Sequence, residues 1–257
     1  MATVKEMEAC LYDWAPRELA ESWDNVGLLV GSGGRKVKKI LVALDITEAV
    51  AQEAIDMGAD LIVAHHPVMN CTWHKVQNVV DDNPQGRILT KLLKNDIAAI
   101  CMHTNLDAAQ GGVNDCLARK LGLSETIPLT EEKIGRVGTL SCEKGLEEFL
   151  AFVVESLGCG GLRYRDGGNR VYKVAVGGGA CGDFIEQAIA LWCDTFVTSD
   201  LTYHEFLDTQ GLNLIDAGHF PTENVVCGAV KCYLGKQFPE TEIIISTVHQ
   251  DVIQYYM

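Results

Sequence analysis

The chain has 257 residues, of which 47% are hydrophobic, and its formal net charge is −14. This length allows a substantial core in one large or two smaller domains, and the acidic balance argues against a nucleic-acid or anionic-membrane partner. No stretch approaches the roughly 18 apolar residues of a membrane span, and the first residues lack a secretory apolar segment. We therefore expect a cytoplasmic protein.

In the first half of the chain, apolar runs typical of buried strands alternate with segments of helical periodicity. An amphipathic helix is expected to end near Pro16, before a short helix and a strand over 25–31. Thr47 is placed to cap the helix after the next strand. The further expected strands are 40–45, 61–64 and 97–102, and the expected helices are 48–57, 86–94 and 113–121. Such alternation is typical of a mainly parallel sheet with helices on its faces.

A change of composition over 124–135, with Pro128 and several acids, is interpreted as a linker between two lobes. A second series of strands and helices follows it. The expected strands are 137–140, 172–176, 195–198, 212–216 and 242–247, and the expected helices are 146–157, 183–191, 201–208 and 224–234. We expect a first α/β lobe over 1–125, to which a C-terminal strand at about 240–257 returns, and a second over 126–239.

The two halves share a pattern of polar residues at strand ends. Each half has a strand with a polar end, and then a strand that ends in His with an acid four residues later. The residues of this pattern are His65-His66, His103 and Asp107 in the first half, and Ser199-Asp200, His219 and Glu223 in the second. Such similarity suggests internal duplication. The expected fold is two similar α/β lobes with helices on mainly parallel or mixed sheets, facing each other across a cleft.

The histidine pair is the first indication of a metal site. His65 and His66 follow a buried strand that Pro67 ends, because proline has no N–H to donate to a ladder. Open α/β sheets bind ligands at the carboxyl ends of their strands. Imidazole and carboxylate together suit zinc, iron, manganese or nickel. The predicted ligands of two divalent ions in the cleft are His65, His66, Asp107, His219 and Glu223.

Several of these residues also have simpler interpretations. Asp107 or Glu223 can cap the helix that follows it, and His219 can be a hydrogen-bonded core residue. The coincidence of all these groups at strand ends favours the metal site. No other cofactor is predicted. Gly177 to Gly182 fit G-x-G-x-x-G, the fingerprint of dinucleotide-binding proteins, but the same pattern fits a tight turn or a helix N-terminus that binds a substrate phosphate.

The remaining histidines are weaker candidates. His103 and His204 are the candidate catalytic residues, as general acids or bases, or they orient ligands or have structural roles. His74 and His249 have no supporting pattern and are interpreted as surface or packing residues. The ten cysteines show no metal or redox spacing, and most have apolar neighbours, so we expect them to be reduced and buried.

The motifs together resemble the Nif-three-like family, also called GTP cyclohydrolase I type 2 homologues, over nearly the whole chain. The matching segments are Ser22 to Leu28, Ala64 to Pro67, His103 to Asp107, Ser199 to His204 and Gly218 to Glu223. The resemblance implies two related α/β lobes, a pair of metal ions held by the five predicted ligands, and assembly as a homohexamer. The ending at 250–257 differs from the family's Asn-Pro-containing tail, which leaves the pairing of the last strand open.

The donor set and the resemblance favour a dinuclear metal-dependent hydrolase acting on a purine nucleotide such as GTP. One ion would activate a water and the second would polarise the bond attacked, while His103 or His204 moves protons. Two other functions stay open. One is a non-enzymatic metal-binding protein or metallochaperone, which the acidic charge suits, and the other is a regulatory interaction protein.

Overall fold

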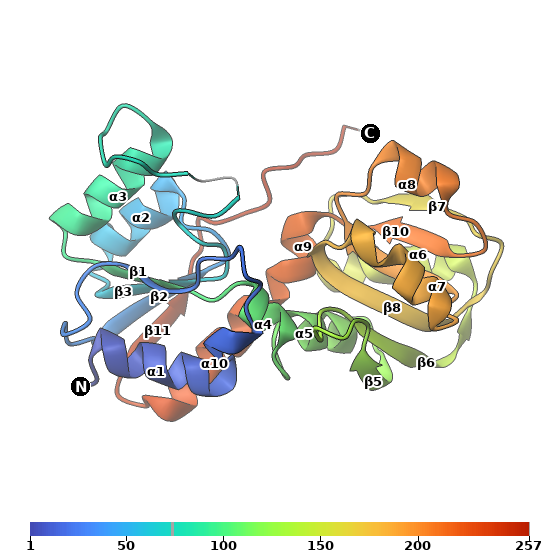
Figure 1. Ribbon diagram of the computed structural model, residues 1–257, viewed down its shortest axis with the longest axis horizontal. Coiled ribbons are helices and arrows are strands. Elements are labelled where there is room, and N and C mark those ends of the chain that lie inside the picture. The colour runs from blue at the N-terminus through green and yellow to red at the C-terminus, as the bar shows by residue number, and fades with distance from the viewer. Residues whose placement is uncertain (73–74, 257) are drawn as a thin grey trace. The chain divides into compact units, whose positions relative to one another are not determined.

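The computed structural model describes residues 1–72 and 75–256, so that His74 lies outside the described residues. The chain divides into two compact units (Figure 1). The first unit is Met1–Ala109 with Cys227–Gln250, and the second is Gln110–Val226 with Asp251–Met257. Within the described residues, no helix is long and apolar enough to cross a membrane.

The first unit contains a five-stranded sheet of order β1-β4-β3-β2-β11. Its strands are β1 (Gly27–Val30), β2 (Lys39–Ala43), β3 (Leu61–Ala64), β4 (Ala98–Cys101) and β11 (Glu242–Ile245). The strands β4, β3, β2 and β11 run parallel, and β1 is antiparallel to β4. The register pairs Ala43 with Ala64 and Ala64 with Cys101, so that three strands end level with one another. The loops that follow them therefore leave from one edge of the sheet.

Helices cover both faces of this sheet (Figure 1). The helices α2 (Glu48–Asp56) and α3 (Pro84–Lys94) lie on one face, and α1 (Val4–Trp14) and α10 (Val225–Gln237) on the other. Coverage on both sides explains why every residue of β3 and β4 is buried. As predicted, Thr47 caps α2 by accepting a hydrogen bond from Val50 N at 3.1 Å. The short elements are the 3-10 helix η1 (Arg17–Leu19) and α4 (Thr104–Ala108).

The second unit contains a six-stranded sheet of order β5-β6-β8-β9-β10-β7. Its strands are β5 (Ser124–Pro128), β6 (Arg136–Lys144), β7 (Arg163–Arg165), β8 (Val171–Ala180), β9 (Thr195–Ser199) and β10 (Asn213–Asp216). The strands β8, β9 and β10 are parallel, and the other pairings are antiparallel. Two sheets with helices on them confirm the predicted α/β class, and the second sheet is mixed.

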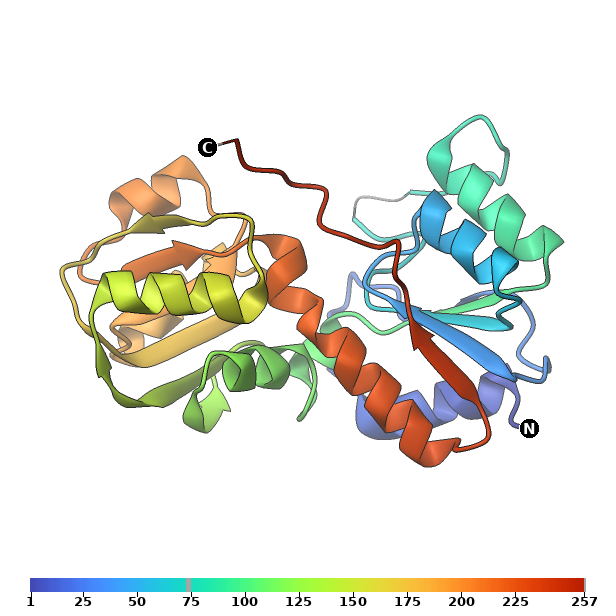
Figure 2. The same cartoon turned by 180° about the vertical axis from the view of Figure 1, so that it is seen from behind.

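The helices of the second unit are short except for two. They are α5 (Val113–Lys120), α6 (Leu146–Leu157), η2 (Gly182–Phe184), α7 (Ile185–Ala190), α8 (Tyr203–Asp208) and α9 (His219–Glu223). Figure 2 shows α6 lying across one face of the sheet. Phe149 and Val153 of α6 share a buried core with Leu117 of α5 and with Val176 of β8. This core fixes the strands whose ends carry the polar groups of the unit.

The unit boundaries differ from the predicted ones. The first unit ends at Ala109 rather than after residue 125, because α5 and β5 pack on β6 and β8. The expected linker over 124–135 contains β5, whose residues are all exposed and therefore show no apolar run. The chain returns to the first unit at Cys227, before the predicted 240. The reason is that α10 packs on α1, with the Tyr233 ring 4.7 Å from Trp14.

All ten cysteines are free. Seven are buried, which agrees with the prediction for most of them, whereas Cys142 and Cys232 are exposed. Burial raises the pKa of the Cys101 thiol to about 12 and that of Cys159 to about 11. These buried thiols are therefore protonated and unreactive at neutral pH.

Candidate metal centre

Two imidazoles lie together where β3 ends in the first unit. The backbone N–H groups of His65 and His66 both donate to Leu44 O, at 3.1 and 2.9 Å. In a regular strand neighbouring side chains point to opposite faces. Here the chain has left the strand, and the two ring centroids are 5.0 Å apart.

His103, at the end of β4, completes a group of three imidazoles. Its ring centroid is 5.1 Å from that of His65 and 5.5 Å from that of His66. One nitrogen from each ring lies within 4.8 Å of the others, which makes this group a candidate metal site. Asp107, one turn along α4, adds a carboxylate whose Oδ1 is 3.6 Å from His65 Nε2. Asp107 lies in the short helix α4, and all four side chains are buried.

Each of the three imidazoles has its Nδ1 in hydrogen-bond contact with a protein oxygen. The partners are Met102 O for His65 at 2.8 Å, Asp45 Oδ1 for His66 at 2.7 Å, and Asp24 Oδ1 for His103 at 2.9 Å. A carbonyl or carboxylate oxygen can only accept, so the ring proton is assigned to Nδ1. The neutral ring then carries its lone pair on Nε2, the nitrogen that it offers to a metal ion.

The sequence predicts no site role for the two carboxylates that hold these rings, although Asp24 lies in the matching segment Ser22 to Leu28. The Asp24 carboxylate also accepts from Thr104 N at 3.0 Å. Burial would raise the pKa of Asp24, but hydrogen bonds from His103 and Thr104 lower it to about 2. Burial acts likewise on Asp45, where hydrogen bonds from His249 and His66 hold the pKa well below its usual range. Asp45 stands at the polar end of an apolar run, the same signal that marks the histidine pair.

His249 is not a surface residue. Its side chain is 8% exposed, and its Nε2 lies 3.2 Å from Asp45 Oδ2. The interpretation of His249 as a residue without supporting context is therefore incomplete. Only the pairing of β11 beside β2 brings it to the end of β2, and no local pattern in the sequence indicates this.

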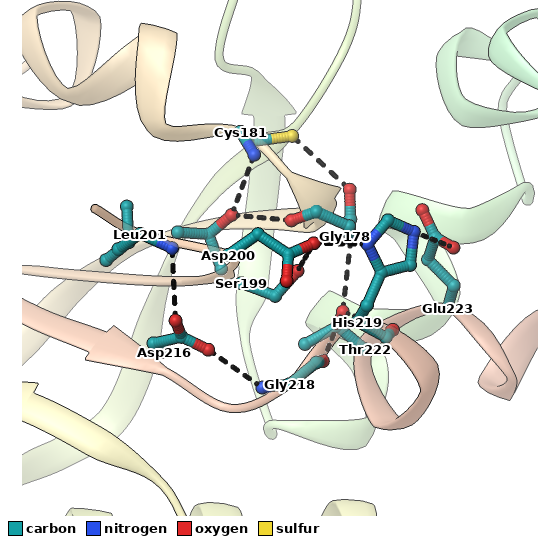
Figure 3. Close-up of polar contacts among 12 residues, drawn as sticks. Gly178, Cys181, Ser199, Asp200, Leu201, Asp216, Gly218, His219, Thr222 and Glu223 are labelled. Carbon is teal, nitrogen blue, oxygen red and sulfur yellow. Dashed lines mark hydrogen bonds and ion pairs between the residues drawn. The ribbon is translucent and has the colours of Figure 1, made fainter. Parts of the chain in front are cut away.

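In the second unit, the His219 ring lies between two carboxylates (Figure 3). Its Nδ1 is 2.5 Å from Asp200 Oδ2, and its Nε2 is 3.0 Å from Glu223 Oε2. Asp200 follows β9, and Glu223 is one turn along α9. Burial alone would lower the pKa of His219, but the hydrogen bonds that its ring donates to Asp200 and Glu223 raise it to about 11. A cation that binds Nε2 must therefore displace a proton.

Asp216 positions the loops that carry these residues. Its Oδ2 accepts from Leu201 N at 3.0 Å, and its Oδ1 accepts from Gly218 N at 3.1 Å (Figure 3). The first bond ties the end of β10 to the loop after β9. Gly218 has a φ of 85°, a left-handed conformation that lets the chain turn directly into α9. Asp216 thereby holds both the loop that carries Asp200 and the start of α9, which carries His219.

The glycine-rich segment forms the end of β8 and the residues directly after it, and several of its N–H groups are already hydrogen-bonded. Three of them donate to side chains of the same unit. These bonds join Gly178 N to Asn114 Oδ1 at 2.9 Å, Gly179 N to Thr222 Oγ1 at 3.1 Å, and Cys181 N to Thr198 Oγ1 at 3.2 Å. A phosphate-binding loop needs such groups for its anion. These bonds argue against a phosphate at these three positions, and the pattern is the end of a strand whose register with β9 is irregular between Val176 and Ala180, rather than a tight turn.

Close packing explains at least one of these glycines. Gly179 has a φ of +69°, and a Cβ built on it would overlap Glu223 Oε1 and lie 3.3 Å from His219 Cε1. A side chain would also be strained in this left-handed conformation. The glycine therefore leaves room for the Glu223 carboxylate.

His204, the second candidate catalytic residue, is exposed on α8. Its ring centroid is 5.5 Å from that of Tyr203, in an edge-on arrangement. Within the described residues, no group of metal-ligating side chains includes it. Its catalytic role stays a prediction from the sequence.

Comparison with known proteins identifies relatives along the whole chain. The GTP cyclohydrolase 1 type 2 homolog of Clostridium perfringens is 38% identical over 253 residues, which cover 95% of each chain. Among solved structures, the Bacillus cereus protein related to NIF3 has a TM-score of 0.93 and 26% identity, with 100% of both chains covered. Reduced HcgD from Methanocaldococcus jannaschii has a TM-score of 0.81 and 30% identity, covering 95% of this chain and 97% of its own.

The family model described as Duf34/NIF3 (NGG1p interacting factor 3) matches residues 2–252. This match covers all the strand-end motifs on which the resemblance was based. The predicted relationship is confirmed, and the chain belongs to the DUF34/NIF3 family.

Proposed function

We propose that this protein is a metal-dependent hydrolase with a two-ion centre. The proposed ligands are His65, His66, Asp107, His219 and Glu223. The observation that carries the proposal is the hydrogen bonding of four imidazoles. In each of them Nδ1 contacts a protein oxygen; the four are His65, His66, His103 and His219. This arrangement directs Nε2 toward a cation and is typical of histidines that bind metals. The assignment of ligands from both units to one centre follows from the resemblance of the sequence motifs to the family.

The donors fit divalent zinc, iron, manganese or nickel, because each of these ions accepts imidazole and carboxylate ligands together. Bound ions would supply an activated water and polarise the bond to be hydrolysed. His103 accepts a proton at Nε2 in this proposal, and the Asp24 carboxylate on its Nδ1 stabilises the resulting imidazolium. Asp200 orients the His219 ring, and Asp45 orients the His66 ring, each through its contact with Nδ1.

The proposed substrate is a purine nucleotide such as GTP. This part of the proposal rests on relatives that are named GTP cyclohydrolase 1 type 2 homologs. The resemblance extends the proposal to a homohexamer, and the sequence adds a cytoplasmic location. Light scattering coupled to size-exclusion chromatography measures the number of subunits.

The test begins with protein purified without a chelating tag, whose metal content is measured beside that of Glu223→Ala. Protein loaded in turn with zinc, iron, manganese and nickel is then assayed on nucleotides and phosphoesters. Hydrolysis that depends on the metal and is lost in the variant supports the proposal. Metal-loaded protein that hydrolyses nothing, but exchanges ions rapidly and transfers them to an apo acceptor, would instead be a metal-handling protein. If neither protein binds metal, the proposal is wrong.

A further inference from the structure

The Asp45 carboxylate bridges two imidazoles in the first unit. Its Oδ1 is 2.7 Å from His66 Nδ1, and its Oδ2 is 3.2 Å from His249 Nε2. We infer that His249 is a positioning residue, which orients His66 by fixing the carboxylate that holds it. The inference rests on the proposed function in one respect, namely that His66 is a metal ligand.

The sheet order explains why these three residues meet. His66 follows β3, Asp45 follows β2, and His249 comes four residues after the end of β11. The three strands are neighbours in the order β3-β2-β11 and run parallel, so their carboxyl ends lie along one edge. A row of hydrogen-bonded groups therefore runs along this edge, from the candidate ligand to the segment after the last strand.

The segment that carries His249 is itself anchored. Glu53 of α2 accepts hydrogen bonds from Ser246 Oγ at 2.5 Å, Thr247 N at 2.9 Å and Thr247 Oγ1 at 2.8 Å. His249 N donates to Ser246 Oγ at 3.2 Å. The imidazole is thus presented by a fixed piece of backbone. A side chain on such a support can restrict the carboxylate that it contacts.

Asp45 needs this second contact because one hydrogen bond does not define the plane of a carboxylate. The terminal torsion of an aspartate is broad, and this side chain is 40% exposed, so that water competes for its oxygens. With His66 on one oxygen and His249 on the other, both oxygens have a fixed direction. The direction of the His66 ring, and hence of its Nε2, follows from them.

Two variants at position 249 and one matched control separate positioning from simple packing. His249→Leu fills the space with an apolar side chain and removes the hydrogen-bond donor, whereas the amide of His249→Gln can still donate to Asp45. Thr247→Val removes one anchor of the same segment without touching Asp45. Circular dichroism and thermal unfolding confirm that each variant is folded.

The first readout is binding of Co²⁺, followed by its visible absorption bands. Loss of a group that orients a metal ligand weakens binding about 10–100-fold. We expect this loss and an altered spectrum for His249→Leu, recovery to within a few-fold for His249→Gln, and no change for Thr247→Val. Wild-type binding with an unchanged spectrum in His249→Leu would overturn the inference. Equal losses of Co²⁺ affinity in His249→Leu and Thr247→Val would also contradict it, because His249 would then act only by holding its backbone segment in place.

The second readout needs no metal. Nitrogen-15 shifts of the His66 ring in the metal-free protein report which nitrogen carries the proton. We expect Nδ1–H in the wild type and in His249→Gln, and a mixture of tautomers in His249→Leu. If the wild type binds no Co²⁺, the proposed metal centre fails, yet these shifts still test the inference. Identical shifts in all three proteins would refute it.

Discussion

The two units place their imidazoles in different electrostatic settings. In the first unit, Nδ1 of His66 and of His103 contacts one carboxylate each, from Asp45 and Asp24. In the second, both nitrogens of His219 contact carboxylates, which raises its pKa to about 11. Carboxylates on both sides of a ring stabilise its protonated form. The first unit is thus arranged to direct lone pairs, whereas the second holds a proton where a cation would bind.

The sheets of the two units also differ, in the strand beside the first parallel strand. Each contains three parallel strands in sequence order, β2-β3-β4 or β8-β9-β10, with an antiparallel strand beside the third. Beside the first strand they differ, because β11 is parallel to β2 while β6 is antiparallel to β8. The carboxyl end of β11 therefore leads to His249 beside Asp45, whereas β6 brings its amino end, with Arg136, to the corresponding edge.

Two single variants, each of which removes one imidazole from a different unit, should have the largest effect. His66→Ala and His219→Ala each delete a proposed ligand, so the metal content should fall from about two ions per chain to about one or none. Elemental analysis measures it. His204→Ala is the matched control, since it removes an exposed imidazole outside the ligand set, and it should keep both ions. If one of the two ligand variants keeps full metal content, the histidine that it lacks is not a ligand of the centre.

Gly179→Ala should disturb the second unit without touching the first. The added Cβ would overlap Glu223 Oε1, and the residue has a φ of +69°. We expect the free energy of unfolding to fall by at least about 2 kcal/mol, from left-handed strain and overpacking together, with loss of metal. Urea denaturation and elemental analysis measure both effects. Gly145→Ala, which has open space around it, should change stability by no more than about 0.5 kcal/mol; an equal loss there would contradict the packing argument.

Asp24→Asn and Asp200→Asn compare the carboxylate that contacts His103 in the first unit with one that contacts His219 in the second. The Asp24 side chain is 0% exposed and accepts from His103 and Thr104, so its replacement should cost about 1–3 kcal/mol of unfolding free energy. The Asp200 side chain is 53% exposed, so Asp200→Asn should lower the free energy of unfolding by no more than about 0.5 kcal/mol. Its replacement should instead lower the pKa of His219, because its hydrogen bond is the largest cause that raises it. An NMR titration that finds no such decrease would count against this assignment.

The smallest expected effect is a pH dependence of stability in the metal-free protein, because the His219 side chain is 40% exposed and solvent screens its contacts with the carboxylates. His219 has a raised pKa of about 11 in the folded state, against 6.5 for the ordinary group. Its contribution is therefore fully present below pH 6.5 and is lost as the pH rises toward 11. Urea midpoints measured over this range should fall more steeply for the wild type than for His219→Gln. Parallel profiles would show that His219 is not held as an imidazolium.

The sequence predicts those features that depend on neighbouring residues. The helix expected at 146–157 is α6 with the same bounds, because its apolar periodicity and flanking glycines are local signals. The buried strands are likewise visible as apolar runs, and the polar residues after them identify the candidate ligands. In contrast, β5 and β7 escaped prediction, since one is wholly exposed and the other has only three residues.

The sequence by itself determined the α/β class, the family and the chemical types of the donor groups. Only the tertiary structure decided which carboxylate holds which imidazole. Asp24 and His103 are 79 residues apart in the chain, and Asp45 and His66 are 21 apart. These contacts depend on the order of strands in the sheet, and strand order is set by the burial of both sheet faces rather than by any local pattern. For the same reason His249, which has no signal of its own, gained its place beside Asp45 from the pairing of β11 with β2.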